Sequence, residues 1–181
     1  MWEQNDIKKV LFSEEEIIKR TKEIGEQITE DYRNNENPML LVGLLRGSVP
    51  FLAELIKHID LDVQYDFMDV QSYAGTESQG DIKILKDLDT SIKGFDILLV
   101  EDIVDTGKTI ETVVETLLHK GAASVKIVTL LDKPSRRVAN AYADYIGFEV
   151  ENEFVVGYGM DFDQKYRNLP YIGVLKDECY K

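Results

Sequence analysis

The stretch ILLVEDIVDTGKTIETVVETLL, residues 97–118, contains an apolar run, a short polar loop and an amphipathic segment in direct succession. The apolar run at 95–101 has the character of a strand that is covered on both faces. The apolar residues that follow the loop recur with helical period, and Gly121 ends that helix. A buried strand followed at once by a helix is the unit of a parallel sheet, so this stretch predicts an α/β protein.

Strand-like and helical segments alternate on both sides of this stretch. Further strands are predicted at 39–45, 62–70 and 124–131, and helices are predicted after Ser13 and at 51–59. Ser13 and Glu16 have the spacing of a capping box, and Pro50 suits a first helical turn. We therefore expect a mostly parallel twisted sheet flanked by helices, with sites at the carboxyl ends of its strands.

The composition is that of one globular domain. The chain has 181 residues, of which 44% are hydrophobic and 30% charged, and its single Cys179 cannot form an intramolecular disulfide. No apolar run has the length of a membrane span and no signal peptide is recognisable, so we expect a cytoplasmic protein without a membrane partner. A net charge of -13 also argues against a nucleic-acid partner.

The loop between the strand and the helix carries the chemistry. Glu101 and Asp102 end the strand, and residues 105–109 lead into the helix, whose free N–H groups and dipole favour an anion. Gly107 allows the backbone to approach a phosphate closely. Neighbouring carboxylates bind hydroxyl groups or a hard cation such as Mg²⁺. Together these features fit a sugar phosphate that carries a diol and a metal ion.

A P-loop is the competing interpretation of this loop, because Gly107, Lys108 and Thr109 match the end of that motif. The P-loop motif requires a glycine five residues before Gly107, where this chain has Asp102. We therefore reject a nucleoside triphosphatase.

The string VEDIVDTGKT, residues 100–109, resembles the signature with which type I phosphoribosyltransferases bind 5-phosphoribosyl-1-pyrophosphate (PRPP). From about residue 39 to the C-terminus the chain is similar to the bacterial hypoxanthine-guanine phosphoribosyltransferase family. The resemblance implies the type I fold in a single domain, 1–181, with a small hood lobe built mainly from about 145–181 and a further candidate contribution from the N-terminus. It implies purine salvage with Mg²⁺, in which hypoxanthine or guanine and PRPP give IMP or GMP and pyrophosphate, in a homodimer or homotetramer.

The resemblance also assigns roles to individual residues. The implied contacts to the ribose phosphate are Glu101, Asp102, Asp105, Thr106, Gly107, Lys108 and Thr109. The implied contacts to pyrophosphate are Leu45, Arg46, Gly47 and Arg167, where some relatives have lysine in place of Arg46. The implied contacts to the purine are Lys133, Phe154, Val155 and Asp161. The implied lid residues are Ser72 and Tyr73, within 71–80. The implied metal ligands are Glu101, Asp102 and Asp161.

The reaction itself suggests the catalytic residue. The purine must lose a proton as it attacks the ribose, and Asp105 is the candidate acceptor at N7. A duller interpretation makes Asp105 the N-cap of the following helix. Lys133 alone would more often be a solvated loop residue, Phe154 a core residue, and Asp161 or Arg167 a member of a surface ion pair.

Two other functions compete. A regulator with the same fold would sense PRPP or nucleotides and bind RNA or DNA, and the acidic charge argues against it. A transferase for xanthine, orotate or adenine would need a different base site, and the donor on Lys133 favours a 6-oxopurine. His58 and His119 lie in amphipathic helices without a neighbouring ligand residue, so they are expected to be structural and no zinc site is predicted.

Overall fold

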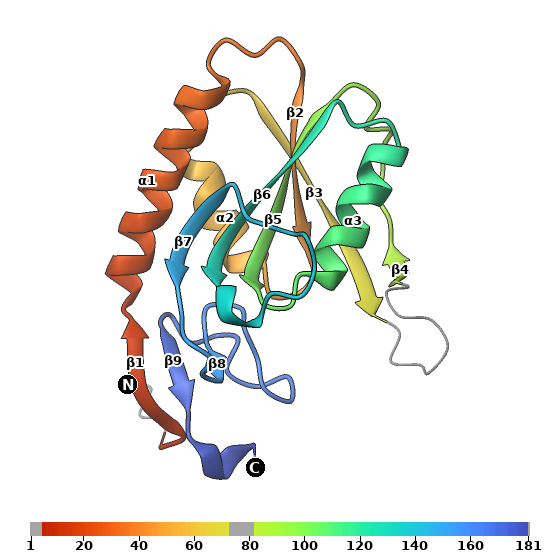
Figure 1. Ribbon diagram of the computed structural model, residues 1–181. Coiled ribbons are helices and arrows are strands. Elements are labelled where there is room, and N and C mark those ends of the chain that lie inside the picture. Colours follow the sequence, from red (N-terminus) through yellow and green to blue (C-terminus); the bar gives the residue numbers. More distant parts are fainter. Residues whose placement is uncertain (1–4, 73–81, 181) are drawn as a thin grey trace.

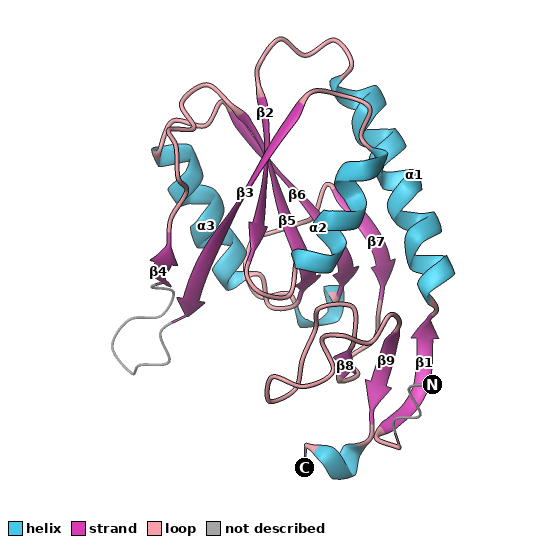
Figure 2. Ribbon diagram, turned by 180° about the vertical axis from the view of Figure 1, so that it is seen from behind, coloured by secondary structure: helices cyan, strands magenta, loops and turns pink. Residues whose placement is uncertain are grey.

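The computed structural model describes residues 5–72 and 82–180, and a six-stranded sheet lies at its centre (Figures 1 and 2). The strand order is β4-β3-β2-β5-β6-β7, and every neighbouring pair is parallel except β3 and β4. The strands are β2 (Met39–Leu44), β3 (Val63–Ser72), β4 (Ile82–Lys86), β5 (Asp96–Val104), β6 (Ser124–Asp132) and β7 (Tyr145–Glu149). The predicted mostly parallel sheet is confirmed.

Helices cover both faces of this sheet, as the alternating pattern predicted. The helices α1 (Glu14–Tyr32) and α2 (Val49–Leu55) lie on one face, and α3 (Lys108–His119) lies on the other (Figure 1). The helix predicted at 51–59 is divided into α2 and a 3-10 turn, η1 (Ile56–His58). Among the described helices, none is long and apolar enough to cross a bilayer.

The continuous apolar character of β5 follows from its two buried faces. Leu98 and Val100 belong to the core that contains α1 and α2, whereas Ile97 and Leu99 belong to the core that contains α3. Side chains alternate across a strand, so a strand between two helical layers must be apolar at every position. The strand does not end at Glu101 and Asp102, as the sequence suggested, but continues to Ile103 and Val104, which again pack against the two cores.

The first helix begins at the predicted cap. The Ser13 hydroxyl accepts a hydrogen bond from the Glu16 amide at 3.3 Å, and the Glu16 carboxylate accepts one from the Ser13 amide at 2.8 Å. This reciprocal pair is the predicted capping box. Ile17, Ile24 and Ile28 then point into the core from successive turns, because their spacing places them on one face.

A second, three-stranded antiparallel sheet lies beyond the carboxyl ends of the large sheet (Figures 1 and 2). Its order is β1-β9-β8, with β1 (Ile7–Phe12), β9 (Ile172–Leu175) and β8 (Val155–Val156). The N-terminal segment thus joins the C-terminal one. Residues 145–149, which the sequence placed in the hood lobe, form β7 and belong to the large sheet instead, because they pair with β6.

Candidate active site

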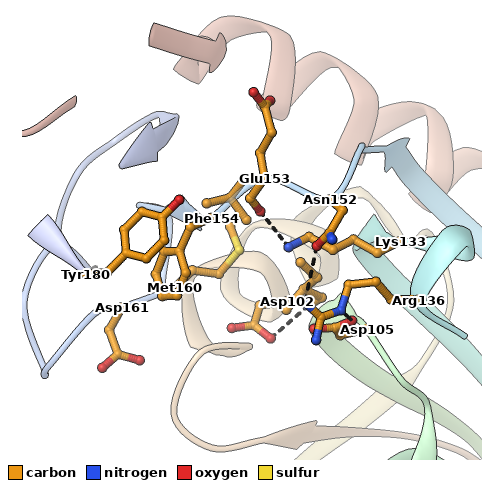
Figure 3. Close-up of a pocket in the computed structure, with 12 residues that line it drawn as sticks. Asp102, Asp105, Lys133, Arg136, Asn152, Glu153, Phe154, Met160, Asp161 and Tyr180 are labelled. Carbon is orange, nitrogen blue, oxygen red and sulfur yellow. Dashed lines mark hydrogen bonds and ion pairs between the residues drawn. The ribbon is translucent and has the colours of Figure 1, made fainter. Parts of the chain in front are cut away.

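A cavity of about 430 Å³ opens between the carboxyl ends of β5 and β6 and the segment that carries β8. Two groups of residues face each other across it in Figure 3. The large sheet and the turn after it contribute Asp102, Ile103, Asp105, Lys133 and Arg136. The C-terminal part of the chain contributes Asn152, Glu153, Phe154, Val155, Met160, Asp161 and Tyr180. The cavity therefore brings together residues that are far apart in the sequence.

The two acidic residues near the carboxyl end of β5, Glu101 and Asp102, have raised pKa values in the ligand-free protein. Burial, and next the charge of Asp102, raise the pKa of Glu101 well above its usual value. Burial raises the pKa of Asp102 to about 6, although the Ile103 amide donates to its Oδ1 at 2.8 Å and Arg167 lies near enough to oppose the shift. Such carboxylates are suited to bind hydroxyl groups or a hard cation. Either ligand would offset the cost of burying the ionised carboxylates.

We expect Asp102→Asn to make the ligand-free protein more stable. Asp102 has a higher pKa folded than unfolded, so its ionised form opposes folding above pH 6 and the opposition disappears below pH 3.8. The stability gain of the variant should therefore grow from pH 4 to pH 6 and reach roughly 1–3 kcal/mol. Chemical unfolding in chelator, with Asp62→Asn as an exposed control, measures it. A variant less stable than the parent at pH 7 would contradict the expectation.

The start of α3 has free backbone amides that could accept an anion. Gly107 is the N-cap, has a left-handed backbone with φ 81°, and accepts the first intrahelical hydrogen bond from Glu111 at 2.9 Å. The amides of Lys108, Thr109 and Ile110 therefore have no acceptor within the helix. The cap has no side-chain hydrogen bond, so the alternative role of Asp105 as N-cap is wrong: the left-handed glycine starts the helix two residues later.

Asp105 lies at the wall of the cavity in contact with Arg136. The Nε atom of Arg136 is 2.7 Å from Oδ1 of Asp105, a close ion pair without the alignment of a hydrogen bond. Arg136 Nη1 also donates to the Asn152 side chain at 3.1 Å. The sequence did not predict Arg136 or Asn152 as site residues. The only local signal for Arg136 was a basic residue three positions after Lys133.

Lys133 is a buried cation that faces the cavity. Only 6% of the residue is exposed, and its Nζ donates to the Glu153 carbonyl at 2.7 Å. Burial lowers the pKa of Lys133, while the charge of Asp105 opposes this shift. Because it is buried, Lys133 is not a solvated loop lysine, and that interpretation is wrong. A buried ammonium also needs further hydrogen-bond acceptors.

Aromatic side chains build the opposite wall. Phe154 stacks against Tyr180 with ring centroids 4.8 Å apart, and the Phe162 ring meets it edge-on at 5.5 Å. Val155 follows Phe154 as the first residue of β8 and is buried. Phe154 is partly exposed and lines the cavity, so it is not simply a core residue.

The loop after β2 packs directly on Asp102. The peptide bond between Leu45 and Arg46 is cis. A Cβ atom on Gly47 would lie 1.6 Å from Oδ2 of Asp102, and a Cβ on Gly159 would lie 2.0 Å from the Gly47 carbonyl. Only glycine therefore fits at these two contacts, through which the loop, β5 and the C-terminal segment touch one another.

Arg167 and Asp161 form an ion pair at 2.9 Å, with about a quarter of each side chain exposed. Arg167 Nη1 also donates to the Gly159 carbonyl at 2.7 Å. The Gln164 side-chain oxygen accepts from Arg167 at 3.2 Å and from Arg46 at 3.5 Å, so the two arginines share one neighbour. The surface ion-pair interpretation is thus correct for the pair, which nevertheless borders the cavity through Asp161.

The three proposed metal ligands do not gather into one cluster. In the described part of the chain, no group of three or more His, Cys, Asp or Glu side chains could hold a metal ion. Glu101, Asp102 and Asp161 therefore do not form a complete protein cage. This arrangement still fits Mg²⁺, which is commonly held by one or two carboxylates together with substrate oxygens and water.

The predicted lid falls mainly outside the described residues. Ser72 is the last residue of β3, where it pairs with Ile82 of β4. Tyr73 and most of 71–80 lie in the part that the structure does not describe.

The sequence of this chain is similar to those of known proteins. The sequence matches the Phosphoribosyl transferase domain family over residues 10–163. It is 59% identical over 175 residues to a hypoxanthine-guanine phosphoribosyltransferase of Lactococcus lactis, covering 96% of this chain and 94% of that protein. It is 56% identical over 178 residues to the protein of that name from Streptococcus thermophilus, covering 98% of each.

Solved structures agree with the sequence comparison. A hypoxanthine phosphoribosyltransferase of Staphylococcus aureus superposes with a TM-score of 0.94 at 49% identity, over 100% of both chains. The Trypanosoma cruzi enzyme in complex with its product IMP gives a TM-score of 0.93 at 39% identity, over 99% of this chain and 100% of that one. The likeness thus extends over both sheets.

Proposed function

This chain belongs to the phosphoribosyl transferase family, and on that premise we propose that it transfers the 5-phosphoribosyl group of PRPP to hypoxanthine or guanine. The products are IMP or GMP and pyrophosphate, and the role is purine salvage. One observation carries the choice of base: a single cavity places the buried Lys133 and Asp105 opposite Phe154. This set provides a donor, a proton acceptor and an aromatic surface for a 6-oxopurine.

The ribose phosphate is proposed to bind at the end of β5 and the start of α3. The amides and hydroxyls of the loop 105–109 receive the 5-phosphate. Glu101 and Asp102 accept hydrogen bonds from the ribose diol, which would relieve their unfavourable burial. Arg46, the Gly47 amide and Arg167 receive pyrophosphate, with Leu45 completing the loop.

Glu101, Asp102 and Asp161 are the proposed ligands that would hold Mg²⁺ together with substrate oxygens, and the ion would supply positive charge for the leaving diphosphate. Arg46 and Arg167 add fixed positive charge on the same side. These cations matter because the protein itself is strongly acidic, with a net charge of -13.

Base recognition is proposed to depend on three contacts. Phe154 stacks on the purine beside Val155, and Lys133 donates to the 6-oxygen. Asp105 accepts the proton from N7 as the base attacks C1 of a ribose with oxocarbenium character. The small sheet, as a hood, and Ser72 and Tyr73, as lid residues, are proposed to exclude water from that centre.

The direct test is an assay with PRPP, Mg²⁺ and one purine at a time. Formation of IMP and GMP, with slow or undetectable use of adenine, is expected. The rate with xanthine tests whether the site accepts an oxygen at the 2-position of the purine. Preferred use of adenine or orotate, or binding of PRPP without any base transfer, would reject the proposal in favour of another transferase or of a regulator.

Lys133→Gln is expected to lower the catalytic efficiency with hypoxanthine and guanine roughly ten- to a hundredfold. A hydrogen bond from a buried ammonium to a carbonyl is worth about 1.5–3 kcal/mol, and about 1.4 kcal/mol corresponds to a tenfold change. Glutamine adds an acceptor, so the loss with adenine should be smaller or reversed. Steady-state kinetics with three bases at constant PRPP affinity measures this. An equal loss for all three would place recognition of the 6-position elsewhere.

A further inference from the structure

Arg136 is a charged residue of the cavity to which the reaction scheme above gives no role. It lies in the 3-10 turn η2 (Pro134–Arg136), directly after Lys133, and its Nε contacts Oδ1 of Asp105 at 2.7 Å. The Asn152 side chain holds the other end of the guanidinium at 3.1 Å. Figure 3 shows Arg136 between Asn152 and Asp105 on the same side of the cavity as Lys133.

The contact distinguishes the two oxygens of Asp105. Its Oδ1 is inaccessible to solvent, yet 38% of the side chain is exposed. That exposure must come from the remaining atoms, which include Oδ2. The carboxylate therefore turns Oδ1 toward Arg136, while the exposed remainder of the side chain lines the cavity.

Arg136 is the closest cation to Asp105 among the described residues. The other charged or titratable groups that line the cavity are Asp102, Lys133, Glu153, Asp161 and Tyr180. Lys133 is held by a backbone carbonyl, and the neighbouring Arg137 is engaged by Asp132 and the Ala141 carbonyl. A guanidinium remains charged at all working pH values, so Arg136 can orient a carboxylate without exchanging protons with it.

We propose that Arg136 is a positioning residue that fixes the proton-accepting carboxylate by binding Oδ1 of Asp105 and so directs Oδ2 to the purine N7–H. This inference rests on the proposed function. The proton moves from N7 to Oδ2 while the N9 lone pair forms the bond to C1. The bond between C1 and the pyrophosphate oxygen breaks, and pyrophosphate leaves with that electron pair. Arg136 neither gains nor loses a proton. The orientation of the carboxylate matters for the rate, because a misplacement of about 1 Å costs on the order of a hundredfold.

A double-mutant cycle tests the inference. The variants are Arg136→Met, Asp105→Asn and their combination, and the measured quantity is the single-turnover rate of IMP formation at saturating PRPP and hypoxanthine. Arg136→Met should lower this rate about tenfold in the parent protein, within the range for a mispositioned catalytic group, and less than about twofold in the Asp105→Asn protein. Arg136→Lys, which keeps a cation, should restore part of the loss.

Further variants separate positioning from folding and from general charge. Asn152→Ala removes the anchor but keeps the cation, so it should lower the rate by about twofold to fivefold, less than Arg136→Met. Arg33→Met removes a cation from the exposed ion pair with Glu30 and should leave the rate unchanged. PRPP affinity and the unfolding temperature should match the parent in every case.

The outcomes are distinguishable. Equal losses in the parent and Asp105→Asn backgrounds, no loss in either, or a faster Arg136→Met protein would each overturn the positioning role; a faster protein would mean that Arg136 competes with the base for Asp105. If the parent protein itself forms no IMP, the proposed function fails. If the parent is active and the cycle is additive, only the inference fails.

Discussion

Asp105→Asn is expected to lower turnover with hypoxanthine about a hundredfold or more, the usual scale for a lost general base. Asparagine retains the shape of the side chain and an oxygen that Arg136 can contact, but its amide cannot accept the N7 proton. The fold and the phosphate site at the start of α3 should be unaffected, because Gly107 rather than Asp105 caps that helix. The loss should therefore appear in the rate of the chemical step.

Rapid mixing under single-turnover conditions, combined with calorimetric titration of PRPP, measures both quantities. PRPP affinity within about twofold of the parent is expected, since a factor of ten corresponds to about 1.4 kcal/mol and no phosphate contact is removed. Turnover close to that of the parent would exclude Asp105 from proton transfer. A parallel loss of PRPP affinity would instead assign Asp105 to substrate binding.

Gly47→Ala is expected to weaken PRPP binding on the order of a hundredfold, the scale of a 1 Å displacement in a positioned site. The new Cβ would lie 1.6 Å from Oδ2 and 2.5 Å from Cγ of Asp102. Asp102 is short, and the Ile103 amide holds its other oxygen at 2.8 Å, so it cannot yield by a simple rotation. Either the loop after β2 or the Asp102 carboxylate, the proposed ligand of the ribose, must move away.

Gly94→Ala is the control for the general cost of losing a glycine. Gly94 has φ 81°, so alanine there is strained by about 1–2 kcal/mol, yet no atom lies within 4 Å of the added Cβ. This variant should lose stability without losing PRPP affinity, whereas Gly47→Ala should lose affinity. Equal PRPP binding by both would show that the contact between Gly47 and Asp102 is unimportant to the substrate.

The large sheet was predictable because each of its central strands has a local signature. The apolar run of β5 reflects the two cores on its faces, and the capping box of α1 lies within four consecutive residues. The strands β1 and β7 have no comparable signature. In β1 the middle residues are exposed, and its partner β9 lies at the other end of the chain, so its pairing depends on tertiary structure.

The candidate site also contains residues that the sequence predicted and residues that it did not. Residues 101–109 are contiguous, and their order alone indicated an acidic pair followed by an anion site. Arg136 meets Asp105, Asn152 meets Arg136 and Tyr180 meets Phe154 only through the tertiary structure, and no local pattern in the sequence predicts these contacts. The interpretation of Asp105 as a cap failed because the left-handed backbone of Gly107 delays the helix start, and backbone angles are not visible in a motif.

The pairing of β1 with β9 sets an order in which the protein can be built during synthesis. Every strand of the large sheet lies within residues 39–149, so the loop 105–109, the proposed phosphate site, can form while the rest of the chain is still being translated. The wall that carries Phe154 needs β9, which ends at Leu175 and whose last residue donates to the Phe154 carbonyl at 2.8 Å. The wall that carries Phe154 is therefore completed only after β9 has been synthesised. Premature termination a few residues before β9 would leave the large sheet intact and this wall without its support.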